Sequence, residues 1–187
     1  MTRLIKLVIA LGFIGAIAAS PAAMAASAAE IDVRVKETLE SFKKEVNGAD
    51  VFLQQAAGYL VFPKVYKVGV GIGGETGEGA LLIGSEVVDY YRTSSGSVGF
   101  QLGAQARSIV IVFMTEESLN QFRNSEGWKV GIDGSVALID LGAGKTIDSK
   151  NIKDPVVGFI FGSKGLMYNL TLEGSKFSKL NPDKRED

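Results

Sequence analysis

Residues 58–84 read GYLVFPKVYKVGVGIGGETGEGALLIG, and within this stretch glycine takes alternate positions of an apolar run. Val68, Val70 and Ile72 fall on one face of a period-two strand, whereas glycines take the other face. A strand face without side chains costs conformational entropy, so it is typical of a place where another backbone approaches closely or a sheet curves sharply. The stretch therefore predicts a tightly curved β-sheet or a small β-barrel.

The same glycines satisfy the G-x-G-x-x-G spacing of a dinucleotide-binding loop at residues 69–74. That motif needs a helix to begin directly after it, because the helix N-terminus holds the pyrophosphate. Here the segment ETGEG at 75–79 follows instead, and it would bring two carboxylates to the phosphates. We therefore reject a nucleotide site.

Composition narrows the classes of function. The chain has 187 residues, 46% of them hydrophobic, which suits one domain with a substantial core. Its formal net charge of −1 gives no overall positive field to recruit nucleic acid. It contains no histidine and no cysteine, which removes the commonest metal ligands, thiol nucleophiles and any imidazole base. We expect no cofactor, no metal, no catalytic residue and no enzymatic activity.

Residues 1–25 have the pattern of a secretory signal peptide. Two basic residues precede the apolar run 7–19, and the small-residue tripeptide AMA closes the segment. This pattern predicts cleavage near the Ala25–Ala26 bond. An uncleaved anchor is the alternative, but about thirteen apolar residues fall short of the roughly twenty that span a membrane. We expect an exported, periplasmic protein that is soluble or peripheral on a membrane.

Residues 27–57 predict two helices ahead of the sheet. The segment SAAE at 27–30 has the capping-box pattern that starts a helix. The opposite face mixes both charge signs, whereas a helix that binds anionic membranes usually has a mostly basic face. Packing on the sheet is therefore favoured, with membrane contact as the alternative, and a short second helix follows over 51–57. The stripe that would pack on the sheet comprises Ile31, Val35, Leu39, Phe42 and Val46.

The remaining chain predicts antiparallel strands with one helix inserted between them. Short links between short strands indicate antiparallel pairing, and Thr115 is placed to cap a helix that ends near Asn124. The fold class we expect is α+β, with N-terminal helices packed on a glycine-rich, strongly curved antiparallel sheet or small barrel. Strands are predicted over 65–74, 79–84, 87–93, 98–106, 108–114, 128–141, 156–162 and 165–172, with turns at 75–78, 85–86 and 94–96 and a polar tail over 181–187.

Several short motifs, taken in order, resemble the SYLF domain, which occurs in bacterial exported proteins and in eukaryotic proteins that bind phosphoinositides and, in some members, actin. The resemblance covers about residues 38–175, within a single SYLF-like domain that we assign to 27–180. The motifs are AG-x-x-VFP at 57–63, K-x-G at 67–69, GG at 73–74, G-x-G at 77–79, G-x-Q-x-G-x-Q at 99–105, G-x-D-x-SVA at 131–137, SKGL at 163–166 and LEG at 172–174.

The resemblance implies a non-enzymatic lipid-binding module whose N-terminal helix and nearby basic residues meet the membrane. An exported bacterial protein would not meet actin, so the partner expected is phospholipid or an anionic membrane surface. A structural or adaptor protein that binds another envelope protein is the alternative, and oligomeric state is left open. Carried onto this sequence, the resemblance indicates Lys36, Lys43, Lys44, Lys64 and Lys67.

The residues themselves support part of this set. Lys64 and Lys67 flank Tyr66, which could place two ammonium groups and an aromatic ring beside a phosphate head group. The alternative is a pair of solvated surface lysines. Arg92 follows two tyrosines and could complete an interfacial patch, although strand alternation sends the tyrosines to opposite faces and one of them into the core. We include Tyr66 and Arg92 among the predicted lipid-binding residues.

Overall fold

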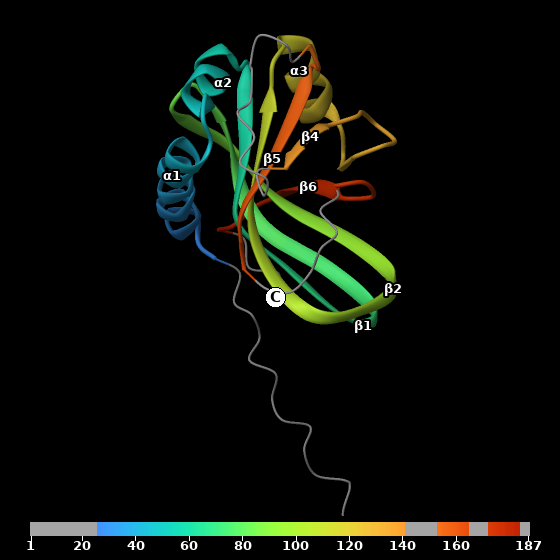
Figure 1. Cartoon of the computed structure of the whole chain (residues 1–187). Coiled ribbons are helices and arrows are strands. Elements are labelled where there is room, and N and C mark those ends of the chain that lie inside the picture. Colours follow the sequence, from blue (N-terminus) through green and yellow to red (C-terminus); the bar gives the residue numbers. More distant parts are fainter. Residues whose placement is uncertain (1–25, 141–152, 165–171, 184–187) are drawn as a thin grey trace, which may run out of the picture.

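A curled β-sheet with helices on both faces forms the body of the protein (Figure 1). The computed structural model describes residues 26–140, 153–164 and 172–183, so the predicted signal peptide at 1–25 lies outside the described residues. The elements are α1 (Ala28–Glu45), α2 (Ala49–Gln55), β1 (Gly58–Ile83), β2 (Glu86–Phe113), α3 (Glu116–Asn124), β3 (Trp128–Lys129), β4 (Ala137–Asp140), β5 (Val156–Lys164) and β6 (Lys176–Leu180).

Strands β1 and β2 form one long antiparallel hairpin, and strands β5 and β6 pair with β2 of this hairpin. Its register runs from Ile83 opposite Glu86 at the turn to Gly58 opposite Phe113 at the base. The turns predicted at 75–78 and 94–96 are therefore wrong, because both segments are extended and paired with each other. Of the predicted turns, the structure keeps the one beside Gly84, whose positive φ of 61° suits glycine.

The hairpin is bent double, so that its tip returns to its base. The Tyr59 hydroxyl near the base donates a hydrogen bond to the Gly84 carbonyl at the tip. A Cβ at Gly77 would lie 2.7 Å from the Lys64 carbonyl oxygen, and one at Gly79 would collide with the Val61 carbonyl. The missing side chains thus let the first half of β1 pack against its second half. This confirms the predicted strong curvature, which Figure 1 shows as the sweep of β1 and β2 at the lower right.

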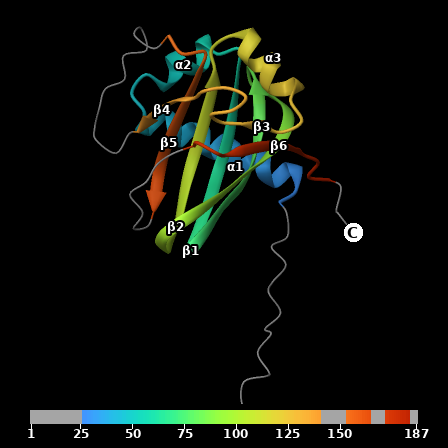
Figure 2. The ribbon, with the colours of Figure 1, turned by 90° about the vertical axis from the view of Figure 1, so that its right-hand side faces the viewer.

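Alternation along the strands divides the core into two clusters, one on each face of the sheet. Figures 1 and 2 show α1 and α2 on one face and α3 on the other. Val61 and Phe159 pack under α1 and α2, whereas Leu60 and Phe113 pack with α3. The central segment of β2, residues 109–113, is buried on both faces, as its continuous apolar sequence suggests.

The predicted helix signals are confirmed at α1 and α3. The Ser27 hydroxyl accepts a hydrogen bond from the Glu30 amide at 3.4 Å, and the Thr115 hydroxyl accepts one from the Ser118 amide at 3.2 Å. Four residues of the predicted α1 stripe are buried, and Leu39 packs at its edge. Helix α2 begins two residues earlier than expected, because Gly48 with φ of 87° stands at its N-cap.

The last part of the sheet departs from the antiparallel expectation. Strand β4 pairs with β5 in parallel, whereas β6 pairs antiparallel with both β2 and β3. Strand β6 lies within the assigned domain but was not predicted, and the 128–141 segment forms two short strands rather than one. The strand predicted over 165–172 falls on residues that, apart from Leu172, lie outside the described part of the chain.

Candidate functional site

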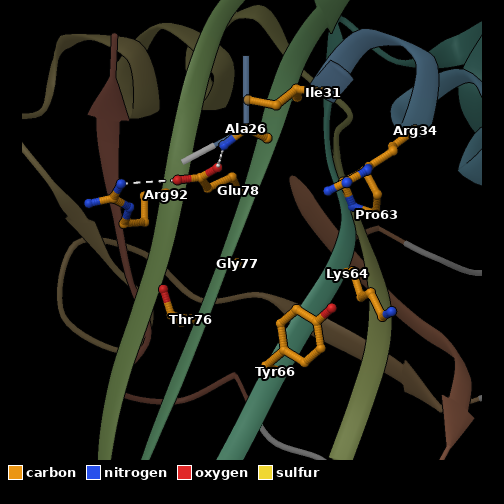
Figure 3. Close-up of a pocket in the computed structure, with 10 residues that line it drawn as sticks. All are labelled: Ala26, Ile31, Arg34, Pro63, Lys64, Tyr66, Thr76, Gly77, Glu78 and Arg92. Carbon is orange, nitrogen blue, oxygen red and sulfur yellow. Dashed lines mark hydrogen bonds and ion pairs between the residues drawn. The ribbon is translucent and has the colours of Figure 1, made fainter. Parts of the chain in front are cut away.

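A pocket of about 450 Å³ lies between the start of α1 and the outer face of the β1–β2 hairpin (Figure 3). Helix α1 reaches it through Arg34, because that side chain follows the buried Ile31 by one turn of the helix. The hairpin forms the rest of the wall, with the bare backbone of Gly77 in the middle. Its lining residues are Ala26, Ile31, Arg34, Pro63, Lys64, Tyr66, Thr76, Gly77, Glu78 and Arg92.

Three cationic side chains from three elements line this pocket. Arg34 comes from α1, Lys64 from β1 and Arg92 from β2. The one carboxylate in the lining belongs to Glu78, whose Oε1 accepts a hydrogen bond from Arg92 Nη2 at 3.0 Å. Cations therefore outnumber carboxylates in the pocket wall, which favours an anionic ligand.

The other two cations are held differently. Arg34 Nη2 donates to Glu30 Oε1 at 2.7 Å along α1, in a pair whose side chains are each 53% exposed. Lys64 Nζ lies 5.1 Å from the centre of the Tyr66 ring, within range of a cation–π contact. Among the described residues, no carboxylate pairs with Lys64, so its ammonium group keeps its hydration and is accessible to an anion.

An exposed row on β1 leads away from the pocket. Lys64, Tyr66 and Val68 alternate with buried residues and so project from the same outer face. Tyr66 is 48% exposed and Val68 is 58% exposed, which leaves aromatic and aliphatic surface in solvent beside a cation. Such a row, charged at one end and apolar at the other, suits the boundary between water and an amphiphile.

The predicted lipid-binding residues fall into three places. Lys64, Tyr66 and Arg92 line the pocket together. The α1 lysines Lys36, Lys43 and Lys44 are exposed on the helix and do not line it, and Lys43 Nζ lies 3.8 Å from an Asp50 carboxylate oxygen. Lys67 is 7% exposed and faces the interior of the bent hairpin. The roles of all seven stay predictions.

A second charged group, absent from the sequence predictions, lies inside the bent hairpin. Arg107 Nη2 donates to both carboxylate oxygens of Glu75 at 2.8 Å, and the two side chains are 1% and 3% exposed. Lys67 and Gln105, which are register partners, are buried on the same inner face. Tyr91 is also buried on this inner face, which confirms the prediction that one of the two tyrosines enters the core. Burial raises the pKa of the Tyr91 phenol well above its ordinary value.

Arg34 and Glu78 are the charged pocket residues that were not predicted from the sequence. Arg34 carries one of the mixed charges of α1, although its spacing of three residues from Ile31 places it at the edge of the buried stripe. Glu78 is the register partner of Arg92, a relation that follows directly from a hairpin closed at Gly84. Because residues 75–78 were predicted to form a turn, the pairing of Glu78 with Arg92 was not predicted.

Comparison with known proteins gives one family. Residues 94–185 match the Ysc84 family, described as Las17-binding protein actin regulator. This confirms the SYLF-family prediction. The SYLF-family match begins within β2 and includes α3 and strands β3 to β6. The SYLF motifs of β1 precede the matched residues but are bonded to them, as in Gly69 opposite Gly103.

The SYLF family is known for lipid and protein binding in general. No protein of curated function matches the chain. Within residues 26–140, 153–164 and 172–183, no helix combines the length and the apolar character needed to cross a bilayer. The same residues contain no group of three or more acidic side chains placed to hold a metal ion.

Proposed function

We propose that this SYLF-family protein is exported and binds anionic phospholipid at a membrane surface, without catalysing a reaction. The observation that carries the proposal is that Arg34, Lys64 and Arg92 line one pocket beside the exposed Tyr66 and Val68. The proposed location is the periplasm, with the protein peripheral on the membrane, which agrees with the secretory pattern of residues 1–25.

The pocket chemistry suits a phosphate head group. A guanidinium presents paired N–H donors that match two phosphate oxygens, and an ammonium group adds a compact charge. Thr76 adds a hydroxyl to the same wall. Tyr66 and Val68 then offer apolar surface where the acyl chains of a bilayer begin. The three parts together match the order of groups in a phospholipid.

A role in binding rather than catalysis is supported by how the acidic groups are engaged. Glu78 and Glu75 each accept hydrogen bonds from an arginine, so both carboxylates are already engaged in ion pairs. The chain has no histidine or cysteine to act as a base or nucleophile near neutral pH. Screening of the purified mature chain for hydrolase activity tests this part of the proposal.

Vesicle co-sedimentation tests the lipid-binding proposal. We expect the mature chain to bind vesicles that contain phosphatidylglycerol, and to bind them less as the salt concentration rises. It should not bind vesicles of phosphatidylcholine alone. Lys64→Glu should weaken binding by about 30-fold, because it replaces a positive charge by a negative one and each charge near an anionic surface contributes about 1 kcal/mol. Lys153→Glu, an equal charge change at an exposed residue outside the pocket, is the matched control. Equal loss in both variants, or no binding at low salt, would contradict the proposal.

A protein partner is the second candidate, since the matched family is described by a protein that its members bind. Ile132, in the G-x-D-x-SVA motif of the matched segment, is 76% exposed. Ile132→Ser should abolish a cross-link to an envelope protein while leaving vesicle binding unchanged. If Ile132→Ser retains every cross-link that the unchanged chain forms, this candidate fails.

A further inference from the structure

The residue that follows the predicted signal cleavage is already attached to the sheet. The Ala26 backbone nitrogen donates a hydrogen bond to Glu78 Oε2 at 3.1 Å, across 52 residues of sequence. Ala26 is half-buried, packs against the core cluster under α1, and lines the pocket. Figure 3 shows this nitrogen and Arg92 on the two oxygens of the same carboxylate.

We propose that the amino terminus created by cleavage after Ala25 is a built part of the pocket, where it forms an ion pair with Glu78. Cleavage by a signal peptidase adds one water across the peptide bond. The carbonyl carbon of residue 25 leaves as a carboxylate, and the nitrogen of Ala26 becomes an ammonium group. A neutral amide donor is thereby replaced by a positively charged group with three donors at the same atom.

The surroundings of Ala26 explain why this ammonium group needs a carboxylate. Ala26 stands one residue before Ser27, the N-cap of α1, and so lies at the positive end of the helix dipole. A positive charge at that end is unfavourable unless a negative group compensates for it. Glu78 supplies that group, with a side chain only 20% exposed and its second oxygen held by Arg92.

Processing also changes the charge of the pocket. Before cleavage, the cation paired with Glu78 in the described part of the chain is that of Arg92. After cleavage Glu78 faces two cations, so the pocket wall gains one positive charge without any movement of the sheet. The proposal rests on the predicted cleavage site and not on lipid binding, so its tests do not involve vesicles.

The first test is the intact mass and N-terminal sequence of the protein recovered after export. The expected mature chain begins at Ala26. A chain that begins at any other residue would overturn the proposal, whatever its affinity for lipid.

The second test is a cycle of four proteins compared by urea unfolding at neutral pH. They are the mature chain and a chain with one extra alanine before Ala26, each with and without Glu78→Gln. The extra residue moves the ammonium group away while leaving an amide at Ala26. We expect it to raise the unfolding equilibrium constant about three- to tenfold when Glu78 is present and to have no effect after Glu78→Gln. Equal effects in both backgrounds would overturn the ion pair.

The pH dependence supplies a readout that does not require Glu78→Gln to fold. Pairing with a carboxylate raises the pKa of the ammonium group above the value it has in the unfolded chain. Its stabilising effect is then present at neutral pH and is lost as the pH rises through the folded-state pKa. The advantage of the mature chain over the extended chain should therefore shrink between about pH 7 and pH 10. A constant difference across this range would contradict the proposal.

Discussion

The β1–β2 hairpin carries two arginine–glutamate pairs that use the same two strands in opposite surroundings. Glu75–Arg107 lies on the inner face, with an N–O distance of 2.8 Å and both side chains almost fully buried. Glu78–Arg92 lies on the outer face at 3.0 Å, with side chains 20% and 45% exposed. The outer pair joins direct register partners, whereas the inner pair joins residues that the register keeps apart.

Because their surroundings differ, the two ion pairs have different roles. The inner pair bridges the two halves of the bent hairpin, because Arg107 is opposite Val65 while Glu75 is opposite Ser95. A buried charge that loses its partner is strongly destabilising, so this pair fixes the bend. An exposed pair adds little stability because water solvates both ions, which leaves Arg92 free to exchange its partner for a ligand.

The largest effect expected is on the inner pair. Glu75→Ala leaves the Arg107 guanidinium buried without its carboxylate and should lower the free energy of unfolding by about 3–5 kcal/mol. Glu78→Ala, the outer counterpart, should cost about 1–2 kcal/mol, because its partly exposed carboxylate pairs with Arg92 and with the proposed ammonium group of Ala26. Urea unfolding followed by circular dichroism measures both. Similar losses at the two positions would remove the distinction between the pairs.

The second prediction concerns the bend itself. Gly79→Ala directs a methyl group into the Val61 carbonyl and should cost about 3 kcal/mol through overpacking. Gly96→Ala is the matched control in the partner strand, since nothing lies within 4 Å of its Cβ position. The control should change the free energy of unfolding by less than about 0.5 kcal/mol. Thermal denaturation of both variants would show whether close approach, and not glycine in general, sets the curvature.

The third prediction uses the outer pair to sharpen the proposed lipid site. Glu78→Gln removes the carboxylate that competes for the pocket cations, so affinity for phosphatidylglycerol vesicles should rise by about fivefold. Glu126→Gln removes the same charge at an exposed position outside the pocket and should change affinity much less. Co-sedimentation at low salt gives both values. An equal gain in both variants would indicate a general charge effect.

The smallest expected effect is at the contact that positions α1 over the pocket. The Tyr90 hydroxyl donates to Asp32 Oδ1 at 2.9 Å, and Tyr90→Phe should cost less than about 1 kcal/mol. Burial, and then the Asp32 carboxylate, raise the pKa of Tyr90 to about 12. The neutral phenol is therefore favoured in the folded state, and its stabilising effect disappears as the pH rises from about 10 to 12. Thermal melts from pH 8 to 12 should show the two chains converging.

Local signals in the sequence were sufficient for α1, for α3 and for the curvature. Ser27 and Thr115 cap helices through contacts three residues away, which a single chain segment contains. Glycine alternation in β1 predicts close backbone approach without naming the partner. In contrast, residues 75–78 contain strong turn formers and were predicted as a turn, although they form strand. Their conformation is decided by Arg107, 32 residues from Glu75, and by the backbone at Lys64 and Val65.

The candidate site shows the same limit. Lys64 and Lys67 flank Tyr66 and were both predicted to bind lipid. Strand alternation, combined with the bend, exposes Lys64 and buries Lys67. Arg34 joins the pocket only because α1 crosses the outer face of the hairpin, a placement that no pattern within α1 specifies. Contacts that arise only from tertiary packing therefore could not be predicted from the sequence.

The return of the hairpin tip to its base has a consequence for the order of assembly. Pairing can start at the Gly84 turn, where partners are close in sequence, but the Tyr59 contact closes only after both strands have bent. The floor beneath α1 also needs Phe159 from β5, near the far end of the chain. The bend of the hairpin should therefore close late in folding, once residues near the far end of the chain are available to pack.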